Sequence, residues 1–145
     1  LRDVYKRQPF QEAERPYLRS LYLAARQAAF TWRDTRNYRL EDFDRSTIGE
    51  EIWVAEQDGK LIGFVSIYRA EDFIHNLYVD PLLPPQGVGS ALLQAAEQTF
   101  TSTGSLKCLV QNRKALAFYH KHGWQSVSTG GDGGEEYYLM HSPKR

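Results

Sequence analysis

Cysteine and long apolar runs are both scarce in this chain. Its 145 residues include one cysteine, Cys108, so no disulfide can form within the chain. Because Cys108 stands in a mostly apolar run, we expect it in the core rather than as a nucleophile. No apolar segment approaches the roughly 20 residues that a membrane-spanning helix needs, and no secretory signal is recognisable. We therefore expect a cytoplasmic protein without membrane attachment.

Neither sign of charge predominates. Lys plus Arg and Asp plus Glu number 18 each, which argues against a dominant nucleic-acid-binding surface. With 41% hydrophobic and 25% charged residues, the chain is expected to form a packed core. Residues 1–8 lack an initiating Met and an apolar period that continues into residues 9–30, and they resemble translated cloning sequence. We therefore expect a non-native leader over residues 1–8 and a single domain over residues 9–145.

Apolar periodicity divides the rest of the chain into helices and strands. It predicts helices over residues 14–30, near 40–43, from a glycine-rich turn to about 100, and over 113–122. Strands are predicted over residues 52–56, 61–68, 72–79, 106–111, 124–129 and 136–141, with a hairpin turn at Asp58-Gly59. The strand, helix, strand order in the second half requires one parallel pair. The predicted fold class is α/β (α+β type), with a mixed, mostly antiparallel sheet of about six to seven strands and about four helices.

The glycine-rich turn, Gln86-Gly87-Val88-Gly89-Ser90, is the most informative motif. The first backbone N–H groups of the following helix have no helical partner and carry partial positive charge. Glycines there let a phosphate approach the backbone without meeting a Cβ. The turn therefore predicts a site for a phosphorylated ligand, with a plain tight turn as the alternative. A nucleotide P-loop is disfavoured, because no Lys-Ser or Lys-Thr pair follows the glycines.

Three segments come one after another in a recognisable order. They are Leu77-Tyr78-Val79-Asp80-Pro81, then Gln86 to Leu93, then Asn112, Ala115, Phe118-Tyr119 and Gly123-Trp124. With a strand between the second and third, they resemble the GNAT superfamily of acyl-CoA-dependent N-acetyltransferases. The likeness in element order extends from about residue 9 to residue 141. It implies acetyl-CoA as co-substrate, no metal, and a parallel strand pair that splays apart to admit the thioester.

The resemblance also implies which residues bind coenzyme A. The pyrophosphate would lie on the backbone amides of Gln86–Ser90. The pantetheine arm would pair with the backbone around Leu77 and Val79, and Asn112 would hydrogen-bond that arm. The alternatives are core side chains for Leu77 and Val79 and a plain helix N-cap for Asn112.

The chain departs from the family pattern just before the glycines. Pro84 stands where the family has Gln or Arg, and Pro85 comes next. Because neither proline has an N–H to donate, we expect a weakened or rearranged phosphate site rather than a lost one. This departure keeps open a non-catalytic acyl-CoA-binding or regulatory module.

Two residues are candidates for the chemistry. Asn112 and Tyr119 are seven positions apart, which places them on nearly the same side of a helix. The resemblance implies that Tyr119 contacts the thioester sulfur. A phenol with a pKa of about 10 can protonate a departing thiolate. His75, two residues before Leu77 and hence expected on the same strand face, is the candidate base for the attacking amine. The alternative for Tyr119 is a core aromatic side chain, and the alternative for His75 is a structural histidine. His122, on the same helix as Tyr119, is expected to lie in solvent.

The acceptor is specified less clearly. Acidic residues outnumber basic ones over residues 34–51, which the resemblance places near the acceptor cleft. One expectation is that these acidic residues attract a cationic amine acceptor. The other is that they form a solvated loop and helix face. The predicted function is acetyl transfer from acetyl-CoA to a primary amine, by direct attack in a ternary complex. The acceptor is a small molecule or a peptide, and the protein a monomer or homodimer.

Overall fold

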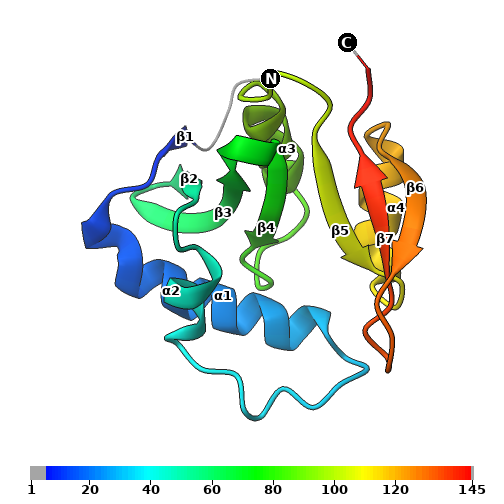
Figure 1. Ribbon diagram of the computed structural model, residues 1–145. Helices are drawn as coiled ribbons and strands as arrows, with labels where there is room; N and C mark the ends of the chain where they lie inside the picture. The colour runs from blue at the N-terminus through cyan, green and yellow to red at the C-terminus, as the bar shows by residue number, and fades with distance from the viewer. Residues whose placement is uncertain (1–5, 145) are drawn as a thin grey trace.

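The computed structural model describes residues 6–144, which form one mixed sheet in the spatial order β1-β2-β3-β4-β5-β7-β6 (Figure 1). Its strands are β1 (Lys6–Pro9), β2 (Glu51–Gln57), β3 (Lys60–Tyr68), β4 (Phe73–Val79), β5 (Ser105–Leu109), β6 (Gln125–Gly130) and β7 (Tyr137–His141). Every neighbouring pair is antiparallel except β4 and β5, which are parallel. The predicted fold class, with its single parallel pair, is confirmed.

Helices cover both faces of the sheet. They are α1 (Arg15–Ala29), α2 (Asp42–Ser46), α3 (Val88–Glu97) and α4 (Arg113–Lys121), with single 3-10 turns η1 (Glu12–Glu14) and η2 (Arg69–Glu71). Leu18 of α1 and Phe43 of α2 are buried in one core cluster with one face of the sheet. Leu92 of α3 and Trp124 after α4 are buried in a second cluster on the other face. The sheet is therefore a central layer between two apolar cores.

Local sequence signals account for most element ends. The Asp58-Gly59 turn joins β2 to β3 with both residues at positive φ, as a tight hairpin requires. Gly123, at φ +86°, ends α4 in the left-handed conformation. The end of α3 differs from the prediction, since the helix stops at Glu97 rather than near residue 100. There the N–H of Phe100 donates to the Glu97 carbonyl, which tightens the chain into a turn.

The N-terminal strand includes residues that the sequence analysis set aside. β1 pairs antiparallel with β2, with Lys6 opposite Glu56 and Pro9 opposite Trp53. Residues 6–8 therefore extend the sheet, while residues 1–5 of the proposed leader lie outside the described residues. None of the helices within residues 6–144 combines the length and apolar character needed to cross a bilayer.

Candidate active site

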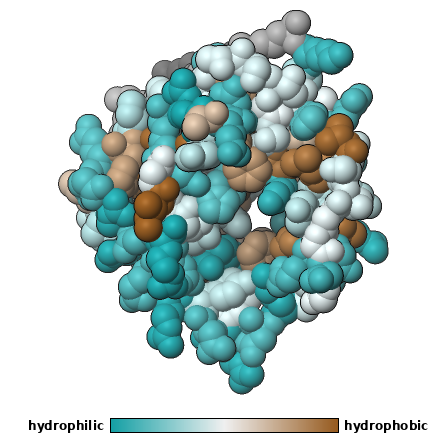
Figure 2. Space-filling model, in the orientation of Figure 1, coloured by the Kyte–Doolittle hydropathy of each residue, from teal (hydrophilic) through white to brown (hydrophobic). Residues whose placement is uncertain are grey.

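The parallel strands β4 and β5 pair only where they begin. Phe73 lies opposite Ser105 and Ile74 opposite Leu106, and the two strands form no further pair within residues 6–144. β4 then continues to Val79 along β3 alone, so its other edge presents backbone without a strand partner in that part of the chain. A cavity of about 430 Å³ lies at this divergence. Figure 1 shows β5 leaning away from β4. In the same orientation, Figure 2 shows a hollow between the part of the molecule that holds β1 to β4 and the part that holds β5 to β7.

The closed end of the divergence is fastened by Asp72. Its carbonyl accepts a hydrogen bond of 3.0 Å from the Ser105 N–H. Its carboxylate accepts the N–H and O–H groups of both Thr101 and Ser102, at 3.0 to 3.3 Å. Burial alone would raise the pKa of this carboxyl, but these donors outweigh it and hold the pKa below its usual value. The start of β5 is thus tied to the start of β4.

A β-bulge lies where the two strands separate. Ser66 and Ile67 are neighbours in β3, but their partners in β4 are Asn76 and Ile74, so His75 is an additional residue. A bulge of this kind bends a strand and redirects its side chains. The bulge therefore coincides with the start of the cavity and leaves His75 outside the regular alternation.

His75 lines the cavity from this bulge. Its Nδ1 lies 2.8 Å from a carboxylate oxygen of Glu50, and its ring is close to the backbone of Ser46. Leu77 also lines the cavity, but it packs against the core cluster beneath α3. Strict alternation, which predicted that His75 and Leu77 share a face, does not hold across the bulge. The hydrogen bond to Glu50 raises the pKa of His75 above its ordinary value despite partial burial.

Helix α4 supplies the opposite wall. Asn112 is its N-cap, with Oδ1 accepting the Ala115 N–H at 3.3 Å, so the capping role considered from sequence is present. Asn112 and Tyr119 both line the cavity, as their spacing predicted. Tyr119 is 9% exposed, and burial raises the pKa of its phenol. Within the described residues its hydroxyl makes no hydrogen bond, so it is available to a ligand.

Cys108 is buried beside the same cavity. Its thiol is 3.7 Å from the Leu109 carbonyl, and burial raises the pKa of the thiol to about 11. A thiol with that pKa carries almost no thiolate at neutral pH. Cys108 is therefore a core residue, as expected, rather than a nucleophile.

The glycine-rich turn lies beyond the cavity, at the far end of β4. Gly87 is the N-cap of α3 at φ +80°, a conformation that favours glycine. A Cβ placed on Gly89 would lie 3.5 Å from Phe118 of α4 and 3.7 Å from Val79 of β4. The turn thus packs between the end of β4 and α4. The first-turn amides of α3 and the unpaired edge of β4 consequently lie along one path.

Side chains of the turn make their own contacts. Val88 is 3% exposed and belongs to the core, so only its backbone can face a ligand. The Ser90 hydroxyl lies 2.9 Å from Nε2 of His122, which places this histidine beside the turn rather than in bulk solvent. Gln86 accepts a long contact of 3.5 Å from Gln57. The cofactor residues predicted from sequence therefore fall into two groups, with Leu77 and Asn112 at the cavity and the others around the turn.

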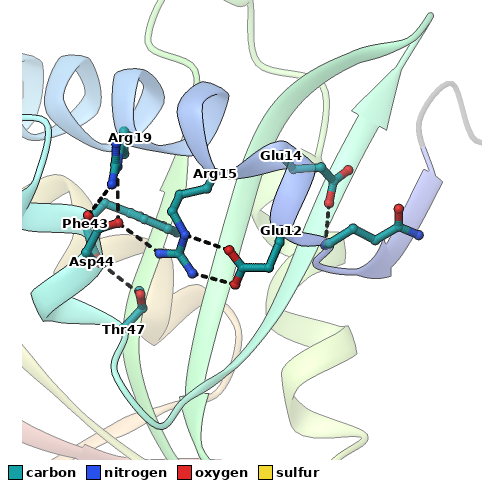
Figure 3. Close-up of polar contacts among 8 residues, drawn as sticks. Glu12, Glu14, Arg15, Arg19, Phe43, Asp44 and Thr47 are labelled. Carbon is teal, nitrogen blue, oxygen red and sulfur yellow. Dashed lines mark hydrogen bonds and ion pairs between the residues drawn. The ribbon is translucent and has the colours of Figure 1, made fainter.

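The acidic residues of the 34–51 segment do not line the cavity. Asp44 is held between Arg15 and Arg19 of α1, as Figure 3 shows. Asp42 pairs with Arg26 and Arg45 in the same way. Asp42 and Asp44 thus fasten α2 to α1, while Glu50 hydrogen-bonds His75. No acidic side chain of this segment lines the cavity, so the lining does not support the expected attraction of a cationic amine.

Cations that sequence reasoning missed line the cavity instead. They are Arg26 near the end of α1, Arg33 in the loop after it, and Lys107 of β5. Lys107 could have been noticed as the single charge within an apolar strand segment, whereas nothing local marks the two arginines. The permanently charged side chains that line the cavity in the described part of the chain are therefore all basic.

Comparison with known proteins agrees with this architecture. A sequence profile of the acetyltransferase (GNAT) family matches residues 10–124. The peptidyl-lysine N-acetyltransferase YiaC of Escherichia coli is 37% identical over 75 residues, covering 52% of this chain and 50% of that protein. The uncharacterized N-acetyltransferase YhfO of Bacillus subtilis is 29% identical over 107 residues, covering 65% of this chain and 68% of that protein. The chain thus spans about half the length of the first relative.

A solved structure shows the same fold. The PaiA N-acetyltransferase of Thermoplasma acidophilum, determined in complex with coenzyme A, superposes with a TM-score of 0.80 at 17% identity, covering 97% of this chain and 99% of that one. The profile match extends over most of the chain, from the residue after β1 to Trp124, just beyond Gly123 at the end of α4. This chain belongs to the acetyltransferase (GNAT) family.

Proposed function

We propose that this protein transfers an acetyl group from acetyl-CoA to a primary amine. The observation that carries the proposal is the divergence of β4 and β5, which leaves a strand edge beside a cavity lined by Tyr119 and His75. Family membership supports the reaction class. One relative is a peptidyl-lysine N-acetyltransferase, which supports a primary amine as acceptor.

The described residues fit coenzyme A. The first-turn amides of α3, from Val88 to Ser90, suit a pyrophosphate because such amides lack helical partners and carry partial positive charge. The edge of β4 around Leu77 and Val79 suits an extended pantetheine chain, which can pair like an added strand. Pro84 and Pro85 contribute no donors, so the affinity for the pyrophosphate depends on the amides that come after them.

The chemistry is a single displacement. Acetyl-CoA supplies an activated acyl group, so the amine nitrogen forms the new C–N bond as the C–S bond breaks. His75 accepts the amine proton, and Glu50 holds its ring in place at 2.8 Å. Tyr119 donates a hydrogen bond to the leaving sulfur. Because burial keeps the pKa of this phenol above that of an ordinary thiol, about 8.5, its main effect is to stabilise the developing thiolate charge.

The test is a turnover assay on the purified chain. The protein is incubated with acetyl-CoA and a panel of primary amines and lysine peptides, while thiol release and the mass of the product are followed. Release of coenzyme A with acetylation of an amine supports the proposal. Saturable binding of acetyl-CoA without thiol release across the panel would instead indicate the non-catalytic acyl-CoA-binding module.

A further inference from the structure

All charged side chains that line the cavity within the described residues are basic. Arg26, Arg33 and Lys107 lie around it together with His75, and no Asp or Glu lines it in that part of the chain. A cationic acceptor would be repelled by this lining in a medium of reduced dielectric constant. The cavity thus favours a ligand with a negative charge close to its amine.

The three permanent cations are compensated to different degrees. Arg26 lies between the rings of Tyr22 and Tyr38, at 4.0 and 4.3 Å, and pairs with Asp42 at 3.1 Å. It is therefore a structural residue. Lys107 lies 4.9 Å from the centre of the Tyr137 ring and makes no ion pair within the described residues. Its charge is the least compensated of the three.

Arg33 makes an exchangeable contact across the mouth of the divergence. Its guanidinium is 2.7 Å from a carboxylate oxygen of Glu135, which is 102 positions away in the connection between β6 and β7. Figure 1 shows this connection and the loop after α1 reaching the same end of the molecule. The Glu135 side chain is 60% exposed, so another carboxylate can replace it without leaving a buried charge behind.

We propose that the acceptor is a small amine that also carries a carboxylate, and that Lys107 and Arg33 bind this carboxylate. A guanidinium matches a carboxylate with two parallel hydrogen bonds, and an ammonium adds a point charge. A volume of about 430 Å³ is within the range of small-molecule sites. The inference rests on the acetyltransferase function proposed above and names the substrate class of the same site.

The test compares amines matched in all but the carboxylate. A methyl group replaces the carboxylate in two pairs, β-alanine with propylamine and 4-aminobutyrate with butylamine. A hydrogen replaces it in the third pair, lysine with cadaverine, and each amine is assayed by thiol release from acetyl-CoA. We expect kcat/KM to be at least about tenfold higher for the carboxylate member of one or more pairs, the range for a hydrogen bond to a charged group. Calorimetric titration of each amine into protein saturated with coenzyme A gives a second readout that needs no turnover.

Variants locate the carboxylate site. Lys107→Gln should remove most of the preference, Lys107→Arg should retain it, and Arg36→Gln should leave it unchanged because Arg36 is an exposed residue outside the cavity. Arg33→Gln should reduce the preference while Glu135→Gln, which breaks the same ion pair but keeps the cation, should not. Equal losses in these last two variants would mean that the ion pair only positions the loop, and would overturn the role of Arg33.

The outcomes separate this inference from the proposed function. No thiol release with any amine would contradict the acetyltransferase proposal, and the binding titration would still decide the acceptor class. Equal kcat/KM and equal binding within every pair would overturn the inference, as would selective acetylation of a lysine peptide that lacks nearby acidic groups. An unchanged preference in Lys107→Gln would also overturn it.

Discussion

The two ends of the candidate site are built from different parts of the polypeptide. At the proposed cofactor end, the available donors are backbone groups of the first turn of α3 and the edge of β4. At the proposed acceptor end, side chains line the cavity, with Lys107, Arg33 and His75 around it. Backbone donors are retained through most substitutions, provided that the chain keeps its path. Side-chain donors change with a single substitution, so the acceptor end can vary while the cofactor end stays constant.

This contrast predicts where substitutions act. Changes at the cofactor end should alter acetyl-CoA affinity only when they alter backbone conformation. Changes at the acceptor end should alter rate, pH dependence or substrate choice without altering cofactor affinity. Tyr119 lies where the two ends meet, so its substitution is expected to have the largest effect on turnover.

Tyr119→Phe removes the hydroxyl and keeps the ring. We expect kcat to fall about 100-fold, the low end of the range for losing one hydrogen-bond donor to developing negative charge, while acetyl-CoA binds with nearly wild-type affinity. Thiol-release kinetics and calorimetry measure the two quantities separately. Tyr17→Phe is a suitable control, because that side chain is 69% exposed and lies outside the cavity. Wild-type turnover in Tyr119→Phe would remove this residue from the mechanism.

Gly87→Val tests whether backbone conformation sets cofactor affinity. A residue with a Cβ in the left-handed region costs about 1–2 kcal/mol, so relaxation of the turn should weaken acetyl-CoA binding about tenfold. Gly49→Val imposes similar strain at φ +74° in the connection between α2 and β2, where a Cβ meets no other atom within 4 Å. It should lower stability and leave acetyl-CoA affinity unchanged. Equal affinity losses in both variants would indicate a general effect of instability.

Glu50→Gln tests the role of His75 through pH. Glu50 raises the pKa of His75, and a base must be neutral to accept a proton, so kcat/KM should rise with pH through that raised pKa. Removing the carboxylate should move the midpoint of this rise to lower pH. It should also remove stability that the protonated His75 contributes at acidic pH and that disappears as pH rises through its folded-state pKa. A pH profile of kcat/KM identical to that of the wild type would argue against His75 as the base.

Asp72→Asn addresses the closed end of the strand pair and should affect turnover least. Four donated hydrogen bonds converge on this carboxylate, so its loss should lower the free energy of unfolding by about 1–3 kcal/mol at neutral pH. Because the folded-state pKa is lowered, the wild type should lose this contribution as pH falls through it. Urea unfolding at neutral and acidic pH measures both. An equal difference between wild type and variant at both pH values would contradict the assignment.

The local structure of the proposed cofactor end could be predicted from sequence because its signals are local. A glycine that must adopt positive φ, an asparagine that caps α4, and the hairpin at Asp58-Gly59 are each determined by neighbouring residues. Their interpretation needs only propensity and spacing. The fold class was predictable from the order of the elements, together with the resemblance carried by the motifs from the end of β4 onward.

The acceptor end could not be predicted because its geometry is long-range. One extra residue at His75 reverses the alternation of β4, and no local signal distinguishes a bulge from a regular strand there. The partner of Arg33 lies 102 positions away, and Asp42 and Asp44 in the acidic 34–51 segment pair with arginines of α1 and of α2 itself. Counting charged residues in the sequence does not show which of them form ion pairs, whereas in the folded chain these carboxylates and arginines are paired.

Calorimetric titration of the purified chain with acetyl-CoA, with ATP as the control ligand, tests the central claim most directly. Saturable binding of acetyl-CoA with no binding of ATP is the predicted result, since the edge of β4 and the turn before α3 together suit a pyrophosphate joined to a pantetheine chain. No binding at millimolar acetyl-CoA, or equal binding of ATP, would contradict the assignment of this cleft to coenzyme A.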